Sequence, residues 1–164
     1  TGPNPGFPTN EGHIVKIREA DADLASATFV WDLFLIAGAG ETSGDGSTVP
    51  DSEAFGSPDG LGFDAYGRMW IQTDGGQPIE CNNQMLCADP TTGEVRRFLV
   101  GVPDCEITGI AFTPDQETMF ISVQHPGDSG GPDDPTATSS WPYGDRPRPA
   151  IVAISKDGGG PVGT

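Results

Sequence analysis

Three acidic residues beside strand-like segments are the first candidates for chemistry in this chain. Glu106 stands directly before an apolar segment, where an exposed acid is not expected. Asp59 precedes a similar segment, and Asp74 follows one. Hard cations such as Ca²⁺ take about 6–8 oxygen ligands, largely from carboxylates and carbonyls. Acids that several strands bring to one point would therefore suit a calcium site.

Each of these acids, except Glu106, also has a plain structural interpretation. Asp59 lies in the turn sequence Ser57-Pro58-Asp59-Gly60, and Asp74-Gly75 is a common hairpin signal. The other polar candidates have structural alternatives too. Asn82 and Asn83 can offer amide oxygens to a metal or simply form a turn. His13 and His125, each beside a strand-like segment, are more typical of structural histidines. Arg146 and Arg148 can bind a phosphate or form ion pairs with carboxylates.

The charge of the chain excludes some classes of partner. The 164 residues include 24 Asp and Glu against 8 Lys and Arg, which gives a formal charge of −16. Such a chain repels nucleic-acid phosphates and anionic membrane surfaces, so neither is expected as a partner. Many of the acids are expected to form only a solvated surface.

Local motifs exclude several enzyme mechanisms. The sequence has no P-loop, HExxH or CxxC pattern, and a nucleophile elbow is not expected. The three cysteines, an odd number, cannot all pair, although Cys81 and Cys87 can close a short loop in an oxidising compartment. The chain opens with Thr1 in a loop-like segment, and we expect it to be a piece of a longer protein.

The elements that must position these side chains are short strands. Segments rich in Val, Ile, Phe, Trp and Thr between turn residues predict an all-β fold, with no convincing helix. Eight strands are predicted, at 12–18, 28–37, 60–64, 68–73, 94–100, 107–112, 118–124 and 149–155. Long loops are predicted at about 38–58 and 126–147.

An internal repeat indicates how these strands are organised. Residues 60–71 resemble residues 109–121, with an apolar strand, a turn and a second apolar strand in each copy. A period of about 50 residues is typical of β-propeller blades, and propellers have about 4–8 blades. The chain is long enough for two to three blades. In a propeller, Asp59 and Glu106 would both approach one mouth of the central channel.

Several ordered segments resemble the PhoX-type alkaline phosphatases. The resemblance extends from about residue 12 to the end of the chain. It rests on FGSPDGL (55–61), GRMWIQTDG (67–75), NNQML (82–86), TGEVRRFLVG (92–101), CEITG (105–109), FTPD (112–115), QHPG (124–127), RPRP (146–149) and KDGG (156–159).

This resemblance implies a six-bladed β-propeller of which residues 1–164 form the C-terminal two to three blades. It implies an exported, periplasmic or extracellular phosphomonoesterase that uses calcium together with iron. Glu106 would be a metal ligand and the catalytic residue of this segment, and Asp59 and Asp74 would contribute more weakly to calcium. Remaining blades, with a further Cys and Glu, would come from the missing part, so the isolated segment is expected to be inactive.

One departure from the family pattern keeps alternatives open. Many relatives are expected to carry a basic residue just before the Cys-Glu pair, where this chain has Asp104. An acid there would repel phosphate unless it binds metal. A calcium-stabilised binding propeller without activity is therefore the first alternative, and a propeller lactonase or phosphotriesterase is the second.

Overall fold

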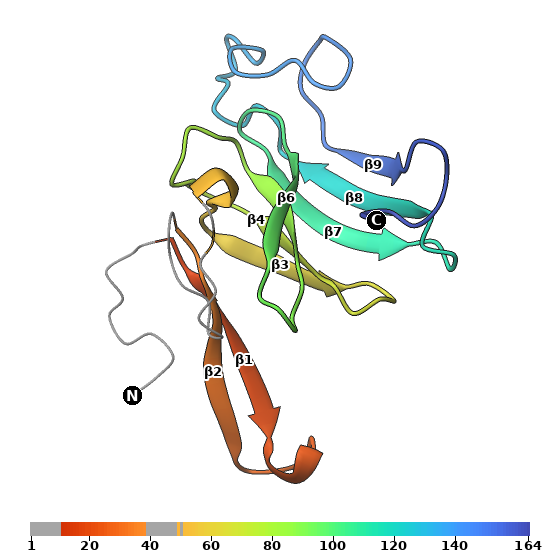
Figure 1. The fold of residues 1–164 in the computed structure, drawn as a ribbon. Coiled ribbons are helices and arrows are strands. Elements are labelled where there is room, and N and C mark those ends of the chain that lie inside the picture. Colours follow the sequence, from red (N-terminus) through yellow and green to blue (C-terminus); the bar gives the residue numbers. More distant parts are fainter. Residues whose placement is uncertain (1–10, 39–48, 50) are drawn as a thin grey trace.

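The fold consists of antiparallel strands joined by turns (Figure 1). The computed structural model describes residues 11–38, 49 and 51–164. Its elements are β1 (His13–Glu19), the 3-10 turn η1 (Ala20–Ala22), β2 (Phe29–Ile36), the 3-10 turn η2 (Asp51–Glu53), β3 (Pro58–Phe63), β4 (Met69–Thr73), β5 (Gln84–Ala88), β6 (Val95–Val100), β7 (Glu106–Phe112), β8 (Thr118–Gln124) and β9 (Ala150–Ser155). The described residues contain no α-helix, and the all-β prediction is confirmed.

Within the described residues the strands form three sheets, with the orders β1-β2, β3-β4-β5-β6 and β7-β8-β9. In Figure 1 the β1–β2 hairpin extends away from the two larger sheets. A four-stranded meander is the unit of a propeller blade. The β3–β6 sheet is thus one whole blade, and the β7–β9 sheet has three of the four strands of the next.

The eight predicted strands are all present, with ends that differ by at most two residues. The sequence prediction missed β5, whose residues Gln-Met-Leu-Cys-Ala lack β-branched and aromatic side chains. This segment is extended because it pairs with β4 on one side and β6 on the other. Four of its five side chains are buried, so tertiary packing determines the strand against a weak local preference.

The internal repeat includes a backbone irregularity. The β3–β4 hairpin changes register between Pro58 and Leu61, and the β7–β8 hairpin does so between Thr108 and Ile110. Each bulge contains one of the two equivalent glycines, Gly60 and Gly109. Bulges bend a strand and redirect its side chains, so the two hairpins present their strand ends in the same way.

Strand β4 lies between two hydrophobic cores. Its five residues are all buried, and neighbouring side chains point to opposite faces. Met69 and Ile71 belong to the core shared with β1 and β2, whereas Trp70 belongs to the core shared with β7 and β8. Full burial of such a side chain stabilises the folded state by about 1.5–3 kcal/mol. Burial on both faces explains the continuous apolar sequence of this strand.

Close backbone contact fixes the two larger sheets against each other. A Cβ atom on Gly62 of β3 would lie 2.5 Å from Cγ2 of Ile110 on β7, so only glycine allows this approach. Nearby, the Gln72 side-chain amide donates a hydrogen bond to the Gly109 carbonyl oxygen at 2.8 Å. The end of β4 and the start of β7 are therefore held in a fixed relation.

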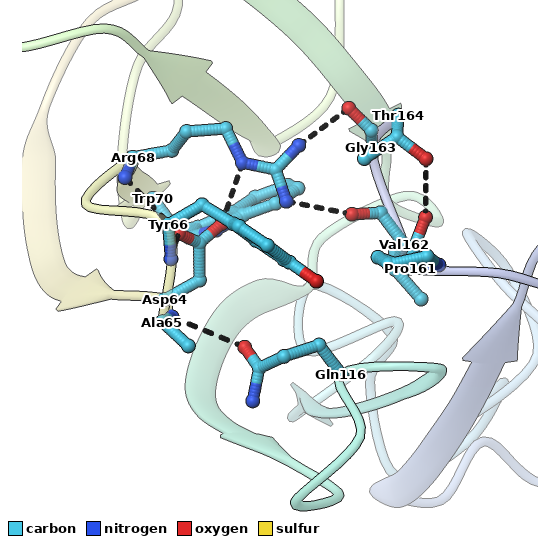
Figure 2. Close-up of polar contacts among 10 residues, drawn as sticks. All are labelled: Asp64, Ala65, Tyr66, Arg68, Trp70, Gln116, Pro161, Val162, Gly163 and Thr164. Atoms are coloured by element: carbon cyan, nitrogen blue, oxygen red, sulfur yellow. Dashed lines mark hydrogen bonds and ion pairs between the residues drawn. The ribbon is translucent and has the colours of Figure 1, made fainter.

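A closed polar network joins the sheets at the β3–β4 turn (Figure 2). The buried Asp64 carboxylate accepts hydrogen bonds from Arg68 Nε at 2.6 Å and from Trp70 Nε1 at 3.0 Å. Arg68 also donates to the carbonyl oxygens of Val162 and Gly163. Burial of Asp64 raises its pKa, but these hydrogen bonds lower the pKa by more, so the net shift is downward.

The two predicted loops have different outcomes. Residues 126–147 form turns with one isolated bridge, between Gly131 and Asp134, as predicted for a loop. Most of the predicted loop at 38–58 lies outside the described residues, and its described part contains η2. The structure has Cys81, Cys87 and Cys105 as free thiols. Within the described ranges, no helix is long and apolar enough to cross a membrane.

Candidate metal centre

Three side chains meet at the edge where β4 ends and β7 begins. Asp74 follows β4, Glu106 is the first residue of β7, and His125 follows β8. One ligand atom from each residue lies within 4.8 Å of the other two. Two of the three predicted site acids, Asp74 and Glu106, are thus brought together by the packing of the two blades.

Glu106 is the buried member of this cluster, with 8% of its surface exposed. It pairs with Gln124 across the β7–β8 ladder, and the Gln124 amide donates a hydrogen bond to Glu106 Oε2. His125 Nε2 lies 3.5 Å from the same oxygen. The hairpin register therefore places His125 beside Glu106, and the carboxylate is fixed on one side by Gln124.

His125 presents a ring nitrogen to the two carboxylates. Its Nδ1 lies 3.2 Å from the Asp104 carbonyl oxygen, which can only accept a hydrogen bond. Nδ1 of the neutral ring therefore carries the proton, and Nε2 is left with a free lone pair toward Glu106. Hydrogen bonding of one ring nitrogen to a carbonyl is a common way of orienting a metal-binding histidine.

The surroundings of His125 favour a positive charge at this point. Burial lowers its pKa, but the hydrogen bond with Asp104 and the charges of Asp128 and Asp74 raise it by more, so the net shift is upward. Either a proton on Nε2 or a metal ion between the three side chains offsets the negative charge. Metal binding thus competes with protonation of the ring.

Backbone conformation at the site is also unusual. Asp104 and His125 both have positive φ angles, of 56° and 36°. Such conformations cost on the order of 1–3 kcal/mol each for residues other than glycine. They are retained where neighbouring structure determines them, and here each residue contributes to the Nδ1 contact that orients the imidazole.

Asn83 connects the segment that carries Asp74 to the segment that carries Glu106. Its Oδ1 accepts hydrogen bonds from Thr73 Oγ1 at 2.9 Å and from the Gly75 backbone at 3.1 Å. Its Nδ2 donates to the Cys105 carbonyl oxygen at 2.8 Å. Its partners Thr73 and Gly75 are the two chain neighbours of Asp74, and its partner Cys105 directly precedes Glu106. It therefore positions the acids rather than joining them as a ligand.

The other candidates lie outside the cluster. Asp59 is exposed on β3 within the bulge, and the repeat makes it equivalent to Thr108, two residues beyond Glu106. His13 begins β1, opposite Ile36 in another sheet. Asn82 donates to the Gly101 carbonyl oxygen. Among the described residues, Asp59 and His13 are not part of the group of ligand atoms formed by Asp74, Glu106 and His125.

Asp104 has a structural use at the rim of the site. Its carboxylate accepts a hydrogen bond from the Ser129 backbone at 3.4 Å. The pKa of this carboxylate is lowered, mainly by a hydrogen bond from Thr138 and further by the contacts with Ser129. These effects outweigh burial, which raises the pKa. The charge of Asp104 thus anchors the loop that follows His125.

The donor set suits a metal ion. Two carboxylates and one imidazole lone pair converge, and no Lys or Arg of the described residues forms an ion pair with Asp74 or Glu106. Carboxylates are ligands for calcium, while imidazole is a ligand preferred by iron and other transition metals. Asp74, Glu106 and His125 would hold such an ion, with additional ligands from outside the cluster.

A four-stranded antiparallel blade packed on a three-stranded one, with an acidic cluster at one strand edge, defines a β-propeller protein with a candidate metal centre. The sequence matches the family described as "Alkaline phosphatase PhoX" over residues 1–127. The chain belongs to this family, as the resemblance predicted. The comparison with curated proteins gave no match.

A solved structure agrees with this assignment. The chain is similar to the structure described as "Pseudomonas fluorescens PhoX in complex with vanadate, a transition state analogue", with 46% sequence identity and a TM-score of 0.83. The match covers 99% of this chain and 29% of that protein. The propeller-blade prediction is confirmed, and the chain spans less than a third of the length of that relative.

Proposed function

We propose that this chain forms part of a metal-dependent phosphatase that hydrolyses phosphate monoesters with calcium and iron. The observation that carries the proposal is the convergence of Asp74, Glu106 and His125 in a chain of the PhoX family. The similar P. fluorescens protein was solved with vanadate, a transition state analogue. Vanadate suits a protein that stabilises phosphoryl transfer.

In this proposal the residues of the chain act by placing positive charge. Glu106, fixed by Gln124, and Asp74, held through Asn83, supply carboxylate ligands. His125 supplies a nitrogen ligand whose orientation is set by Asp104. Bound metal ions supply Lewis-acid stabilisation of phosphoryl oxygens and activate an oxygen nucleophile. No Ser or His nucleophile from this chain is needed.

The proposal includes export of the protein to the periplasm or the extracellular space. Support comes from the family resemblance and from the strongly acidic composition, with a formal charge of −16. The remaining blades of the propeller would complete the ring and add further ligands. The isolated segment of 164 residues is therefore expected to lack activity.

One observation favours a binding role as the second candidate. Asp104 stands where a basic residue was expected from the resemblance, and its carboxylate is used to anchor the loop at Ser129. A propeller that binds metal for stability alone would tolerate this change. Such a protein would keep its metal ions but hydrolyse no phosphate ester.

Hydrolysis of an aryl phosphate by the full-length protein that contains these residues tests the proposal. Activity that a chelator abolishes and that calcium restores, with iron present, supports a metal-dependent phosphatase. A folded, metal-loaded protein without activity overturns it in favour of the binding propeller. A lactone substrate in parallel separates a phosphatase from a lactonase.

A further inference from the structure

A hollow beside the metal cluster contains a basic side chain. It has a volume of about 280 Å³, and its lining includes His125, Asp128 and Arg146. Histidine at this position belongs to the candidate metal centre, whereas Arg146 comes from the segment that leads into β9. The two residues are 21 positions apart in the sequence, and both line this hollow.

The fold holds the Arg146 segment against the turn after His125. A Cβ atom on Gly127 would lie 2.8 Å from Cγ of Pro147, so Pro147 packs directly on that glycine. Gly127 is also fixed by its backbone N–H, which donates to the Pro103 carbonyl oxygen at 3.0 Å. Since Ala150 at the start of β9 pairs with Val123 near the end of β8, this segment enters the sheet at the edge that carries the metal cluster.

Arg146 differs from the neighbouring basic residues in having no acidic partner. Arg148 forms an ion pair with Asp145 at 3.1 Å, and Arg68 forms one with Asp64. Among the residues that the structure describes, no carboxylate forms an ion pair with Arg146, including Asp128 of the same hollow. The Arg146 side chain is also exposed, so its guanidinium remains available to an anion.

We propose that Arg146 binds the phosphoryl group of the substrate beside the metal cluster. This inference rests on the proposed phosphatase function. The planar guanidinium fork matches two phosphoryl oxygens at once, which an ammonium group cannot do in the same geometry. Arg146 would thus supply from the β9 side the positive charge that Asp104 does not supply from the β7 side.

The variants Arg146→Ala, Arg146→Lys and Arg148→Ala test this role in the full-length metal-loaded protein. Loss of a charge-assisted contact is expected to raise the KM for an aryl phosphate and weaken inorganic phosphate binding by about 10–100-fold in Arg146→Ala. Arg146→Lys keeps the charge but loses the fork, so an intermediate value is expected. Arg148→Ala removes the same charge two residues away and should change either value less than about threefold.

Metal content and thermal unfolding of each variant show whether the fold and the cluster are intact. An Arg146→Ala protein with the KM and phosphate affinity of Arg148→Ala overturns the role of Arg146. If the wild-type protein has no phosphatase activity, the proposed function fails. The binding of inorganic phosphate then tests the anion site at Arg146 by itself. Weaker phosphate binding by Arg146→Ala alone still supports the site, and equal binding by both variants overturns it.

Discussion

The two ends of strand β4 carry acids in opposite situations. At its start, Asp64 is buried and bound by Arg68 and Trp70, and Arg68 is in turn bound by two carbonyl oxygens near the C-terminus (Figure 2). At its end, Asp74 and Glu106 converge with His125, and no Lys or Arg of the described residues pairs with them.

The difference separates a structural site from a candidate functional one. Buried charges are costly unless they are paired and hydrogen-bonded, and the Asp64 network meets this condition within the protein. In the Asp74–Glu106–His125 cluster only Glu106 is buried, and a proton or a metal ion there would offset the negative charge that no Lys or Arg of the described residues balances. Both ends lie between the same two blades, so the packing of the blades supports stability at one end and brings the candidate metal ligands together at the other.

Substitution of Glu106 should have the largest effect on function. We expect Glu106→Gln or Glu106→Ala to reduce metal-supported turnover of the full-length protein by more than about 100-fold, because loss of an outer-shell partner alone costs about 10–100-fold. Glu117→Gln, at the opposite end of the β7–β8 hairpin, is the matched control. Wild-type activity in the Glu106 variants would contradict the assignment.

Removal of Asp64 should have the largest effect on stability. We expect Asp64→Ala to lower the free energy of unfolding by about 3–5 kcal/mol, since it leaves Arg68 and the Trp70 indole without their partner. Chemical denaturation measures this loss. Metal affinity should be unchanged in the folded fraction, and a loss of metal without a loss of stability would reverse the proposed roles of the two ends.

Asn83 should affect the metal centre without being a ligand. We expect Asn83→Ala to weaken metal binding by about 10–100-fold, as for other outer-shell partners, because it releases the backbone segments before Asp74 and Glu106. Isothermal titration with calcium measures the change. Asn82→Ala, which removes a single bond to Gly101, is the control, and equal effects of the two substitutions would argue against a specific role for Asn83.

The smallest expected effect is a pH dependence of stability that arises from Asp64. Its pKa in the folded protein is lowered from the ordinary value of 3.8. Its contribution is therefore fully present above pH 3.8 and is lost as the pH falls through the lower folded value. The difference in unfolding free energy between wild type and Asp64→Asn should shrink below this pH. A constant difference down to the acid transition would count against this origin.

Much of the fold follows from the sequence because local patterns and global packing agree. Apolar segments with turn residues at their ends located eight strands, and the repeat identified the blade. Strand β5 was missed because Gln84–Ala88 has little intrinsic β-preference and becomes a strand only between β4 and β6. The strand preference of a short segment carries no information about the strands with which it pairs elsewhere in the sequence.

The site was predictable to the extent that it depends on strand ends. Glu106 and Asp74 were located by their position beside apolar strands. His125 was assigned a structural role, although the register of the β7–β8 hairpin, which pairs Glu106 with Gln124, places it next to Glu106. Asp59 was aligned with Glu106 by approximate repeat position, but the repeat and the two hairpin registers make it equivalent to Thr108. The role of Asn83 depends on side-chain hydrogen bonds, which have no signature in the sequence.

A crystal structure of the full-length protein with its metals, with anomalous scattering to identify them, tests the central claim most directly. The account predicts a metal ion within about 2.0–2.6 Å of Glu106 and of at least one of Asp74 and His125. Metal ions bound elsewhere in the propeller, with these three side chains in contact only with protein and water, would contradict it.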